Sequence, residues 1–497
     1  MYRIGFDNEK YLKMQSERIN ERIGTFGNKL YMEFGGKLFD DFHASRVLPG
    51  FAPNSKVQML KQLSDKAEIV LVINAADIER NKTLGDHGIT YDEDILRSID
   101  AFRKEGLYVG SVVITQFAEQ QSASRFKKRL EQLEITVYLH YLIADYPTNI
   151  SLIISDDGFG KNDYIYTKRP LVIVTAPGPG SGKMAVCLSQ LYHEFKRGVQ
   201  AGYAKFETFP VWNLSLRHPI NLAYEAATTN IKDINLIDPF HMEAYNITAT
   251  SYNRDVEGFS ILNAIFNEIW GSSPYKSPTD MGVNMVGYCI SNEEICQYAA
   301  NQEIVRRYYN ALCEDRTRGG LKADIQKLEM LMKSAGISDP KQTRTVVSRS
   351  LAKAAESESP AMAIELPDGT IITGKTSSLL GAASAALLNT LKFLAKVHDD
   401  VKLISPIMIE PIQKLKIDFL SNNNPRLHTD EVLIALSVCT ATNPTAELVL
   451  DQLPKLKNSE AHSSVILSQV DINILKKLGI SITCEPVYNS KKLYHKS

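Results

Sequence analysis

Apolar runs rich in β-branched residues alternate with charged stretches of helical character, and this alternation constrains the fold more than any other feature. The runs cover residues 68–77, 108–116, 135–145, 170–178 and 234–238. Nearly continuous apolar strands that are separated by helices are typical of a parallel sheet with both faces covered. The sequence therefore predicts an α/β fold over residues 1–240, with a mainly parallel sheet and helices on both faces.

Other parts of the chain predict other structures. Residues 8–23 place apolar side chains at helical spacing and predict an amphipathic helix, whereas residues 30–38 alternate around two glycines and predict a β-hairpin. Residues 241–345 have almost no strand signal and predict a helical domain. Residues 346–497 mix hairpin and helix patterns and predict an α+β domain.

A glycine-rich turn between the apolar run near residue 175 and the next helix is the strongest local signal. Its candidate ligand-binding residues are Gly178, Gly180, Ser181, Gly182 and Lys183. A strand, a glycine loop and a helix often bind phosphate, because loop N–H groups, the helix N-terminus and a lysine all attract an anion. The turn departs from GxxxxGK[ST], since Pro177 replaces the first glycine and Met184 replaces the hydroxyl residue that binds Mg²⁺. It predicts anion binding, weakens the case for hydrolysis of a magnesium nucleotide, and leaves a structural turn as the alternative.

A second segment, residues 369–376, matches the same pattern in full. Its sequence is GTIITGKT, and a Pro-Asp-Gly turn signal overlaps its start. The interior is β-branched throughout, which favours an extended strand over a flexible phosphate loop. The segment therefore predicts a hairpin, with an anion at the start of the following helix as the alternative.

Polar residues follow the predicted strands, where open α/β sheets bind their ligands. They are Asn74, Asp77, Thr115, Gln116, Asp145, Asp238 and His241. Residues 234–238 also resemble a Walker B strand, in which Asp238 would hold a metal or polarise water. Helix capping is the alternative for each of these residues.

Two further clusters are candidate sites. Lys37 and Arg46 lie near several acidic residues and could clamp an acidic substrate, with a solvated turn as the alternative. His218 lies upstream of Asp238 and His241, and the three could form an acid–base group or a metal site. Their irregular spacing leaves helix caps and core histidines as the alternative.

The composition argues against several classes of protein. The chain has 56 basic and 57 acidic side chains, so its net charge of −1 gives no global attraction to nucleic acid or to an anionic membrane. The six cysteines show no CxxC spacing, so we expect neither a disulfide framework nor a Cys-rich zinc site. The first residues lack the apolar core of a signal peptide and no run is long enough to span a membrane, which predicts a cytoplasmic protein.

Several long strings resemble an uncharacterised family of bacterial proteins of similar length. They include YMEFGGKLFDDFHASRVLPGFAPNSKVQML, VTAPGPGSGKMAVCLSQLYHE, FPVWNLSLRHPINLAYEAAT and NLIDPFHMEAYN. The resemblance covers essentially the whole chain and implies an α/β part, a helical domain and an α+β part, but no established function. Some members carry an automatic label of ATP-dependent zinc protease. The motif HExxH is broken here, because Arg197 occupies the position of the second histidine, so we predict no tightly held structural zinc and assign no metal-ligating residues.

Three functions stay open. The first is a phosphate- or nucleotide-binding enzyme, more plausibly a transferase than a hydrolase; its cofactor stays open, with a nucleotide or Mg²⁺ as the candidates. In it Asp145 or Asp238 polarises a water, hydroxyl or metal, and His218 or His241 moves protons. The second is a non-catalytic, oligomeric ligand-binding or regulatory protein. The third is an enzyme that acts on a small phosphorylated metabolite without a nucleotide.

The helix predicted at residues 378–396 carries many small side chains on one face. Small residues allow close packing, so this face lies either in the C-terminal core or in a contact between subunits. Because two-fold dimers are the commonest soluble assembly, we predict a homo-oligomer to which the last part of the chain contributes.

Overall fold

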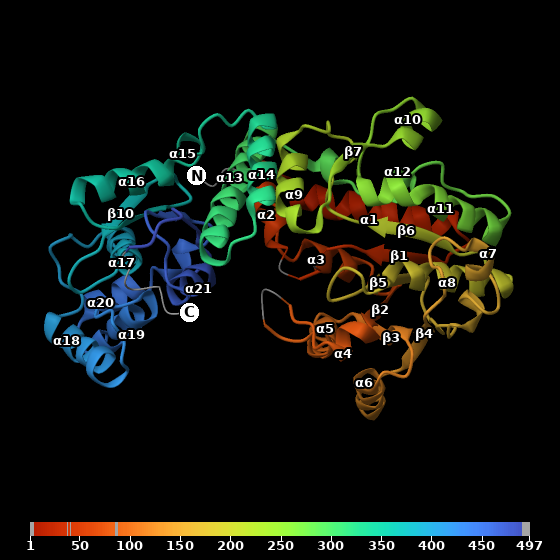
Figure 1. The fold of residues 1–497 in the computed structure, drawn as a ribbon, viewed down its shortest axis with the longest axis horizontal. Helices are drawn as coiled ribbons and strands as arrows, with labels where there is room; N and C mark the ends of the chain where they lie inside the picture. The colour runs from red at the N-terminus through yellow and green to blue at the C-terminus, as the bar shows by residue number, and fades with distance from the viewer. Residues whose placement is uncertain (1–3, 37, 40, 85–87, 490–497) are drawn as a thin grey trace. The chain divides into compact units, whose positions relative to one another are not determined.

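A six-stranded sheet, parallel throughout, forms the centre of the N-terminal unit in the computed structural model (Figure 1). The structure describes residues 4–36, 38–39, 41–84 and 88–489. Contacts divide the chain into two units, Ile4–Ala300 and Asn301–Ser497. The residues predicted as a separate helical domain fall partly in each unit.

The strand order is β4-β3-β2-β5-β1-β6, which confirms the predicted parallel sheet. The strands are β1 Leu30–Phe34, β2 Ala67–Asn74, β3 Tyr108–Phe117, β4 Val137–Tyr141, β5 Leu171–Thr175 and β6 Gly202–Phe206. Central strands such as β2 and β5 are buried along their full length, as expected for strands that are covered on both faces. The predicted hairpin at residues 30–38 is wrong, because β1 pairs in parallel with both β5 and β6.

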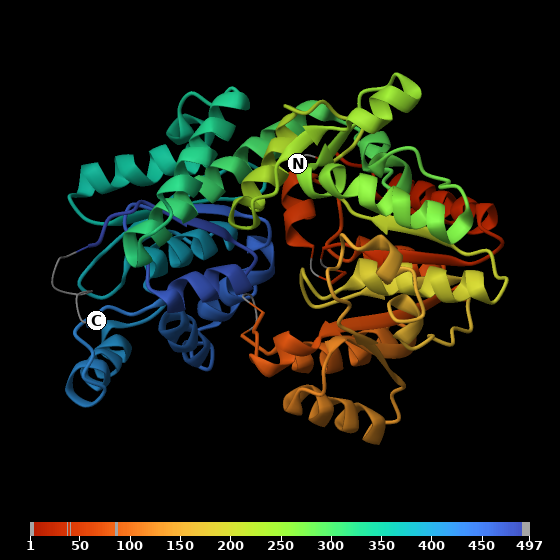
Figure 2. The ribbon, with the colours of Figure 1, turned by 45° about the vertical axis from the view of Figure 1, so that its right-hand side comes forward.

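Helices flank this sheet (Figure 1 and Figure 2). The longer ones are α1 Asn8–Thr25, α3 Ser55–Gln62, α5 Tyr91–Lys104, α6 Gln121–Gln132, α8 Lys183–Lys196, α9 Pro219–Ala227 and α11 Asn253–Trp270. Helix α1 confirms the predicted amphipathic helix. Helix α8 packs on β1, β5 and β6, and α5 packs on β2 and β3.

Shorter elements complete the N-terminal unit. They are α2 Phe42–Val47, α4 Ala75–Glu79, α7 Ile150–Ile153, α10 Pro239–Tyr245, α12 Pro278–Met281 and a separate antiparallel pair, β7 Asn235–Ile237 with β8 Thr250–Tyr252. Helix α13 Glu293–Arg318 contains the boundary between the units.

The C-terminal unit contains a mixed sheet in the order β10-β9-β11-β12. Its strands are β9 Ala361–Glu365, β10 Ile371–Lys375, β11 Glu460–Ser463 and β12 Ser481–Cys484. Its helices are α14 Lys322–Ser334, α15 Pro340–Thr343, α16 Thr345–Ser357, α17 Ala382–Leu394, α18 Pro406–Lys414, α19 Thr429–Cys439, α20 Pro444–Leu450 and α21 Gln469–Lys477.

Helix α17 packs on β9 and β10, and its small side chains face the core of this unit. Ala382, Ala383 and Ala386 are buried there. The small-residue face therefore packs inside the unit, and the homo-oligomer stays a prediction. Among the described residues, no helix is both long and apolar enough to cross a membrane.

Candidate functional site

The carboxyl ends of β2 and β5 lie side by side at a change of direction in the chain. From β2 the chain proceeds to β3 on one side, and from β5 it proceeds to β6 on the other side. Open α/β sheets bind ligands in the crevice that forms at such a point. The glycine-rich turn follows β5 directly, so the fold brings the strongest sequence signal to this position.

The turn has the backbone conformation that its glycines permit. Gly180 and Gly182 have φ angles of 77° and 92°, which disfavour any side chain. A Cβ atom at Gly178 would lie 2.2 Å from the hydroxyl of Tyr91. The side chain of Ser181 is fully buried and donates a hydrogen bond of 2.7 Å to the carbonyl of Gly178, so Ser181 shapes the turn rather than facing a ligand.

Side chains from neighbouring strands hold the carbonyl groups of the turn. Asn74 Nδ2 donates to the Gly180 carbonyl at 3.3 Å, and Thr115 Oγ1 donates to the Ser181 carbonyl at 2.7 Å. Asn74 Oδ1 also caps α4 by accepting from the N–H of Ala76 at 2.8 Å. Asn74, predicted to bind substrate, therefore positions the turn.

The backbone N–H groups of this turn and of the first residues of α8 differ from the carbonyl groups that Asn74 and Thr115 hold. Within the described part of the chain, the N–H groups of Gly180 and of residues 182–185 donate no hydrogen bond, whereas the turn at residues 178–181 directs the N–H group of Ser181 toward the Gly178 carbonyl. Helix α8 has no side-chain cap, and its first N–H donor to a loop carbonyl is that of Val186. Such a row of free donors at a helix N-terminus is the arrangement that binds phosphate.

Lys183 adds a positive charge beside these donors. Its side chain is 14% exposed, and its Nζ lies 3.9 Å from Glu33 Oε1, beyond hydrogen-bond distance. The other oxygen of Glu33 accepts from the Tyr203 hydroxyl at 2.8 Å. The charge of Glu33 therefore attracts the Lys183 ammonium group, but the Lys183 N–H groups do not donate to Glu33 and can donate to a ligand.

Asp77 and Asp145 lie at strand ends, as predicted, in different surroundings. Asp77 is nearly buried and forms an ion pair of 3.2 Å with Lys82, whose Nζ lies over the ring of Tyr91. Asp145 is exposed in the turn after β4. Its neighbour Tyr146 is exposed as well.

Asp238, His241 and His218 do not come from strands of the six-stranded sheet. The comparison with a Walker B strand is wrong, because β7 pairs with β8 in a separate sheet. The Asp238 carboxylate is fully buried and accepts from the N–H of His241 at 3.0 Å and from Thr279. His218 caps α9 by accepting from Ile220, and His241 bonds to the hydroxyl of Ser277. We therefore do not place these residues in the site.

The predicted acidic-substrate clamp is only partly described. Lys37 lies outside the described residues. Arg46 lies in the last turn of α2. The nearby buried cation is Lys56, which forms an ion pair of 2.9 Å with Asp41 and lies 3.3 Å from the position of a Cβ on Gly36.

A polar cluster at the end of β6 was not predicted. Lys205 Nζ lies 2.6 Å and 2.7 Å from the two oxygens of Asp255, and 3.4 Å from Glu207 Oε1. Glu207 Oε1 also accepts from the Tyr252 hydroxyl at 2.9 Å. These residues border a cavity of about 60 Å³ that Phe209 and Trp212 also line. No motif marks the cluster, since Tyr252 and Asp255 come from a distant part of the sequence.

Burial sets the protonation of this cluster. Desolvation raises the pKa of Glu207 above its usual value, and Asp255 adds to that rise, although Lys205 opposes it. Burial lowers the pKa of Lys205, but Asp255 and Glu207 outweigh this effect and raise it overall. Lys205 is therefore a permanent cation, whereas Glu207 can exchange a proton near neutral pH. Buried groups of this kind are frequent at functional sites.

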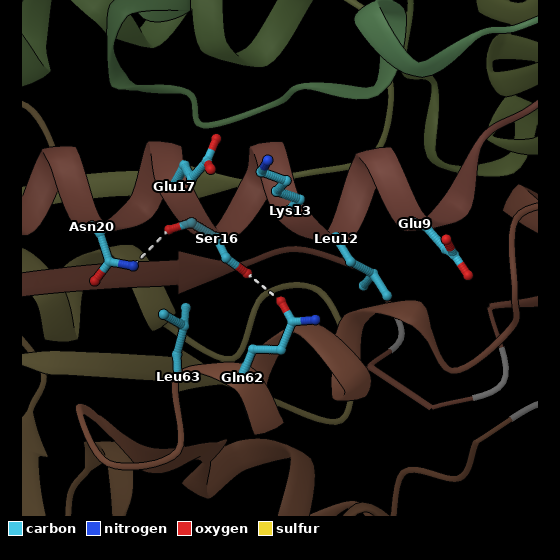
Figure 3. A pocket seen from close by; sticks show the side chains of 8 residues that line it. All are labelled: Glu9, Leu12, Lys13, Ser16, Glu17, Asn20, Gln62 and Leu63. Carbon is cyan, nitrogen blue, oxygen red and sulfur yellow. Dashed lines mark hydrogen bonds between the residues drawn. The ribbon is translucent and has the colours of Figure 1, made fainter.

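A larger groove lies between α1 and α3 (Figure 3). Its volume is about 400 Å³. Ser16 Oγ donates to Gln62 Oε1 at 3.0 Å, and Lys13 and Glu17 point away from Gln62 and Leu63. The polar groups of this groove thus pair with one another or face elsewhere, and we assign it no ligand.

Comparisons with known proteins match the whole chain to proteins without an assigned function. Residues 4–336 match the model "Domain of unknown function DUF1846, N-terminal", and residues 342–494 match its C-terminal counterpart. A UPF0371 protein of Corynebacterium urealyticum is 55% identical over 494 residues, which cover 99% of each chain. A UPF0371 protein of Streptococcus pyogenes serotype M5 is 52% identical over 496 residues and 100% of each chain. One from Streptococcus equi is 53% identical over 494 residues.

Proposed function

The chain belongs to the DUF1846 family, and we propose that it binds the phosphate group of a small phosphorylated molecule at the turn formed by residues 177–183. The observation that carries this proposal is the row of free N–H groups at residues 182–185, with the Lys183 side chain beside it. A phosphate oxygen would accept from these donors, and the dipole of α8 would add to the attraction. The family descriptions name no ligand, so the proposal rests on geometry alone.

A magnesium nucleotide fits this site less well than a simple phosphate ester. Met184 provides no hydroxyl for a metal, and Asp238 lies in a different sheet. Among the strand-end carboxylates, Asp77 is paired with Lys82, and Glu33 accepts from Tyr203. The proposal therefore requires no metal, and a nucleotide would bind chiefly through its phosphates.

We further propose an enzyme rather than a passive binding protein. Glu207, a partly buried carboxylate with a raised pKa, follows β6, which is separated from β5 only by β1. A group that exchanges protons next to a phosphate site suits group transfer to or from a hydroxyl. A transferase is favoured over a hydrolase because the chain carries no GxSxG nucleophile motif.

Isothermal titration calorimetry of wild type, Lys183→Ala and Lys196→Ala tests the binding step. The probes are inorganic phosphate, AMP, ATP and glucose 6-phosphate. We expect Lys183→Ala to weaken binding by about 10- to 100-fold, the usual loss for a charge-assisted hydrogen bond. Lys196 lies at the other end of α8, where its side chain is 57% exposed, so Lys196→Ala should bind like wild type.

Two results would contradict the proposal. The first is a wild type to which no phosphorylated probe binds at millimolar concentration. The second is a folded Lys183→Ala protein, judged by circular dichroism, that binds the probes as tightly as wild type does. Turnover of any bound probe, followed by ³¹P NMR, would then separate an enzyme from a non-catalytic binding protein.

A further inference from the structure

Three neighbouring strands place the glycine turn and Glu207 on one edge of the sheet. The order is β5, β1 and β6, and Lys183 follows β5 while Glu207 follows β6. Adjacent strands are about 4.8 Å apart, so the ends of β5 and β6 are separated by about 10 Å. This separation is close to the length of a phosphorylated sugar or polyol.

The strand between them ends in two glycines. A Cβ atom at Gly35 would lie 2.6 Å from Cγ of Glu207, so Glu207 packs directly against the end of β1. Gly36 follows with a φ angle of 69°. Neither residue has a side chain, so the chain directly after β1 leaves Glu207 uncovered, while the Glu33 carboxylate of β1 lies 3.9 Å from Lys183 Nζ.

Glu207 has an acceptor oxygen that the described residues leave unused. Both oxygens of Asp255 accept hydrogen bonds from Lys205, so Asp255 rather than Glu207 is the main ion-pair partner of that lysine. Glu207 Oε1 accepts from Tyr252, but Oε2 accepts no hydrogen bond from any described residue. The side chain is 25% exposed, so a ligand can approach it from solvent.

We propose that Glu207 is a second binding residue of the same site, and that it accepts a hydrogen bond from a hydroxyl group of a phosphorylated sugar or polyol held by its phosphate at residues 177–183. This assignment rests on the proposed function. A hydroxyl suits Glu207 better than an ammonium group does, because Lys205 already lies 3.4 Å from its carboxylate. The raised pKa of Glu207 agrees, since a partly desolvated carboxylate that lacks donors gains from a new one.

Matched ligands test the assignment by calorimetry. Glycerol 3-phosphate, ribose 5-phosphate and glucose 6-phosphate carry hydroxyls, whereas cyclohexylmethyl phosphate has a sugar-sized ring without them. We expect wild type to bind at least one hydroxylated ester about 10-fold more tightly than cyclohexylmethyl phosphate, as for a hydrogen bond to a charged group. Glu207→Met should remove this preference and leave the affinity for inorganic phosphate within about twofold. Glu207→Gln, which keeps an acceptor oxygen, should retain part of it.

Glu243→Met is the control, because Glu243 is an exposed glutamate on α10, outside the proposed site. It should keep the preference of wild type. Failure of inorganic phosphate to bind wild type contradicts the proposed function and this assignment with it. Phosphate binding without a preference, or a preference that survives Glu207→Met, contradicts the assignment alone. Tighter binding of phosphoethanolamine that Glu207→Met abolishes would assign Glu207 to an ammonium group instead.

Discussion

Two segments of this chain combine glycines with a lysine, and the less complete match has the geometry of a phosphate site. Residues 177–183 depart from the phosphate-loop pattern at two positions, yet they follow a buried parallel strand and open a helix. Residues 369–376 match the pattern in full, yet residues 371–375 are strand β10 of an antiparallel hairpin, as predicted.

The difference lies in where the backbone N–H groups go. In the first segment the carbonyls are held by Asn74 and Thr115, and the N–H groups of residues 182–185 are left without acceptors in the described structure. In the second segment the backbone pairs with β9, and Gly374 lies opposite Met362. A pattern of residue types predicts phosphate binding only when the neighbouring strands leave the donors free.

The largest expected effect separates the two segments by stability. A Cβ at Gly374 would lie 2.1 Å from the backbone nitrogen of Ala386, so Gly374→Ala must displace α17. We expect the free energy of unfolding to fall by about 3 kcal/mol. A Cβ at Gly180 would lie within 4 Å of no other atom, so only the φ angle of 77° disfavours a side chain there. Gly180→Ala should therefore lower the free energy of unfolding by about 1 kcal/mol. Urea denaturation of both variants measures the difference, and equal losses would contradict this account of the two glycines.

The next effect separates the segments by ligand binding. Lys183→Ala should weaken binding of inorganic phosphate by about 10-fold or more, because it removes a charged donor from the row of N–H groups. Lys375→Ala should change nothing, because Lys375 is an exposed residue at the end of β10. Titration calorimetry on both proteins measures the contrast. Weaker binding in Lys375→Ala alone would reverse the assignment of the two segments.

Much of the fold could be predicted from the sequence, because strand burial leaves long apolar runs. Strands β2, β3 and β5 are examples. The order of the strands in the sheet could not be predicted, because no motif specifies it. Strand β1 was misread because Glu33 interrupts its apolar pattern and Gly35-Gly36 looks like a turn. Glu33 is tolerated in a central strand because Tyr203 and Lys183 lie close to its carboxylate, and these partners are more than a hundred residues away.

The site was only partly predictable for a related reason. The glycine turn is local, so its residues could be read directly. Asp238, His218 and His241 looked catalytic, but each makes capping or core hydrogen bonds near its own helix. Glu207 showed no signal, because its environment depends on Tyr252 and Asp255 from another part of the chain.

A smaller effect concerns the free energy of unfolding, which depends on the protonation of Glu207 near the first segment. Glu207 has a folded pKa above its unfolded value of 4.5, so between these two values the folded protein binds a proton that the unfolded chain does not. Its contribution to stability is therefore largest below about pH 4.5 and falls as the pH rises through the folded pKa. Glu207→Gln cannot lose this proton and should gain about 1 kcal/mol over wild type between pH 5 and pH 8.

Urea denaturation of wild type and Glu207→Gln at several pH values measures this gain. A difference between wild type and Glu207→Gln that is constant with pH would show that Glu207 is ionised in both states.

The smallest effect tests the contact that turns the first segment's carbonyls inward. Thr115→Val keeps the shape of the side chain but removes the hydrogen bond of 2.7 Å to the Ser181 carbonyl. We expect a loss of about 1 kcal/mol in stability and a severalfold loss in phosphate affinity, because the turn is then free to rotate its donors. Thr373→Val is the matched change in the second segment, where the threonine hydroxyl donates to no described residue, and it should leave both quantities unchanged. If Thr115→Val costs stability but leaves phosphate affinity intact, the N–H groups are oriented by the glycines alone and not by their neighbours on β3.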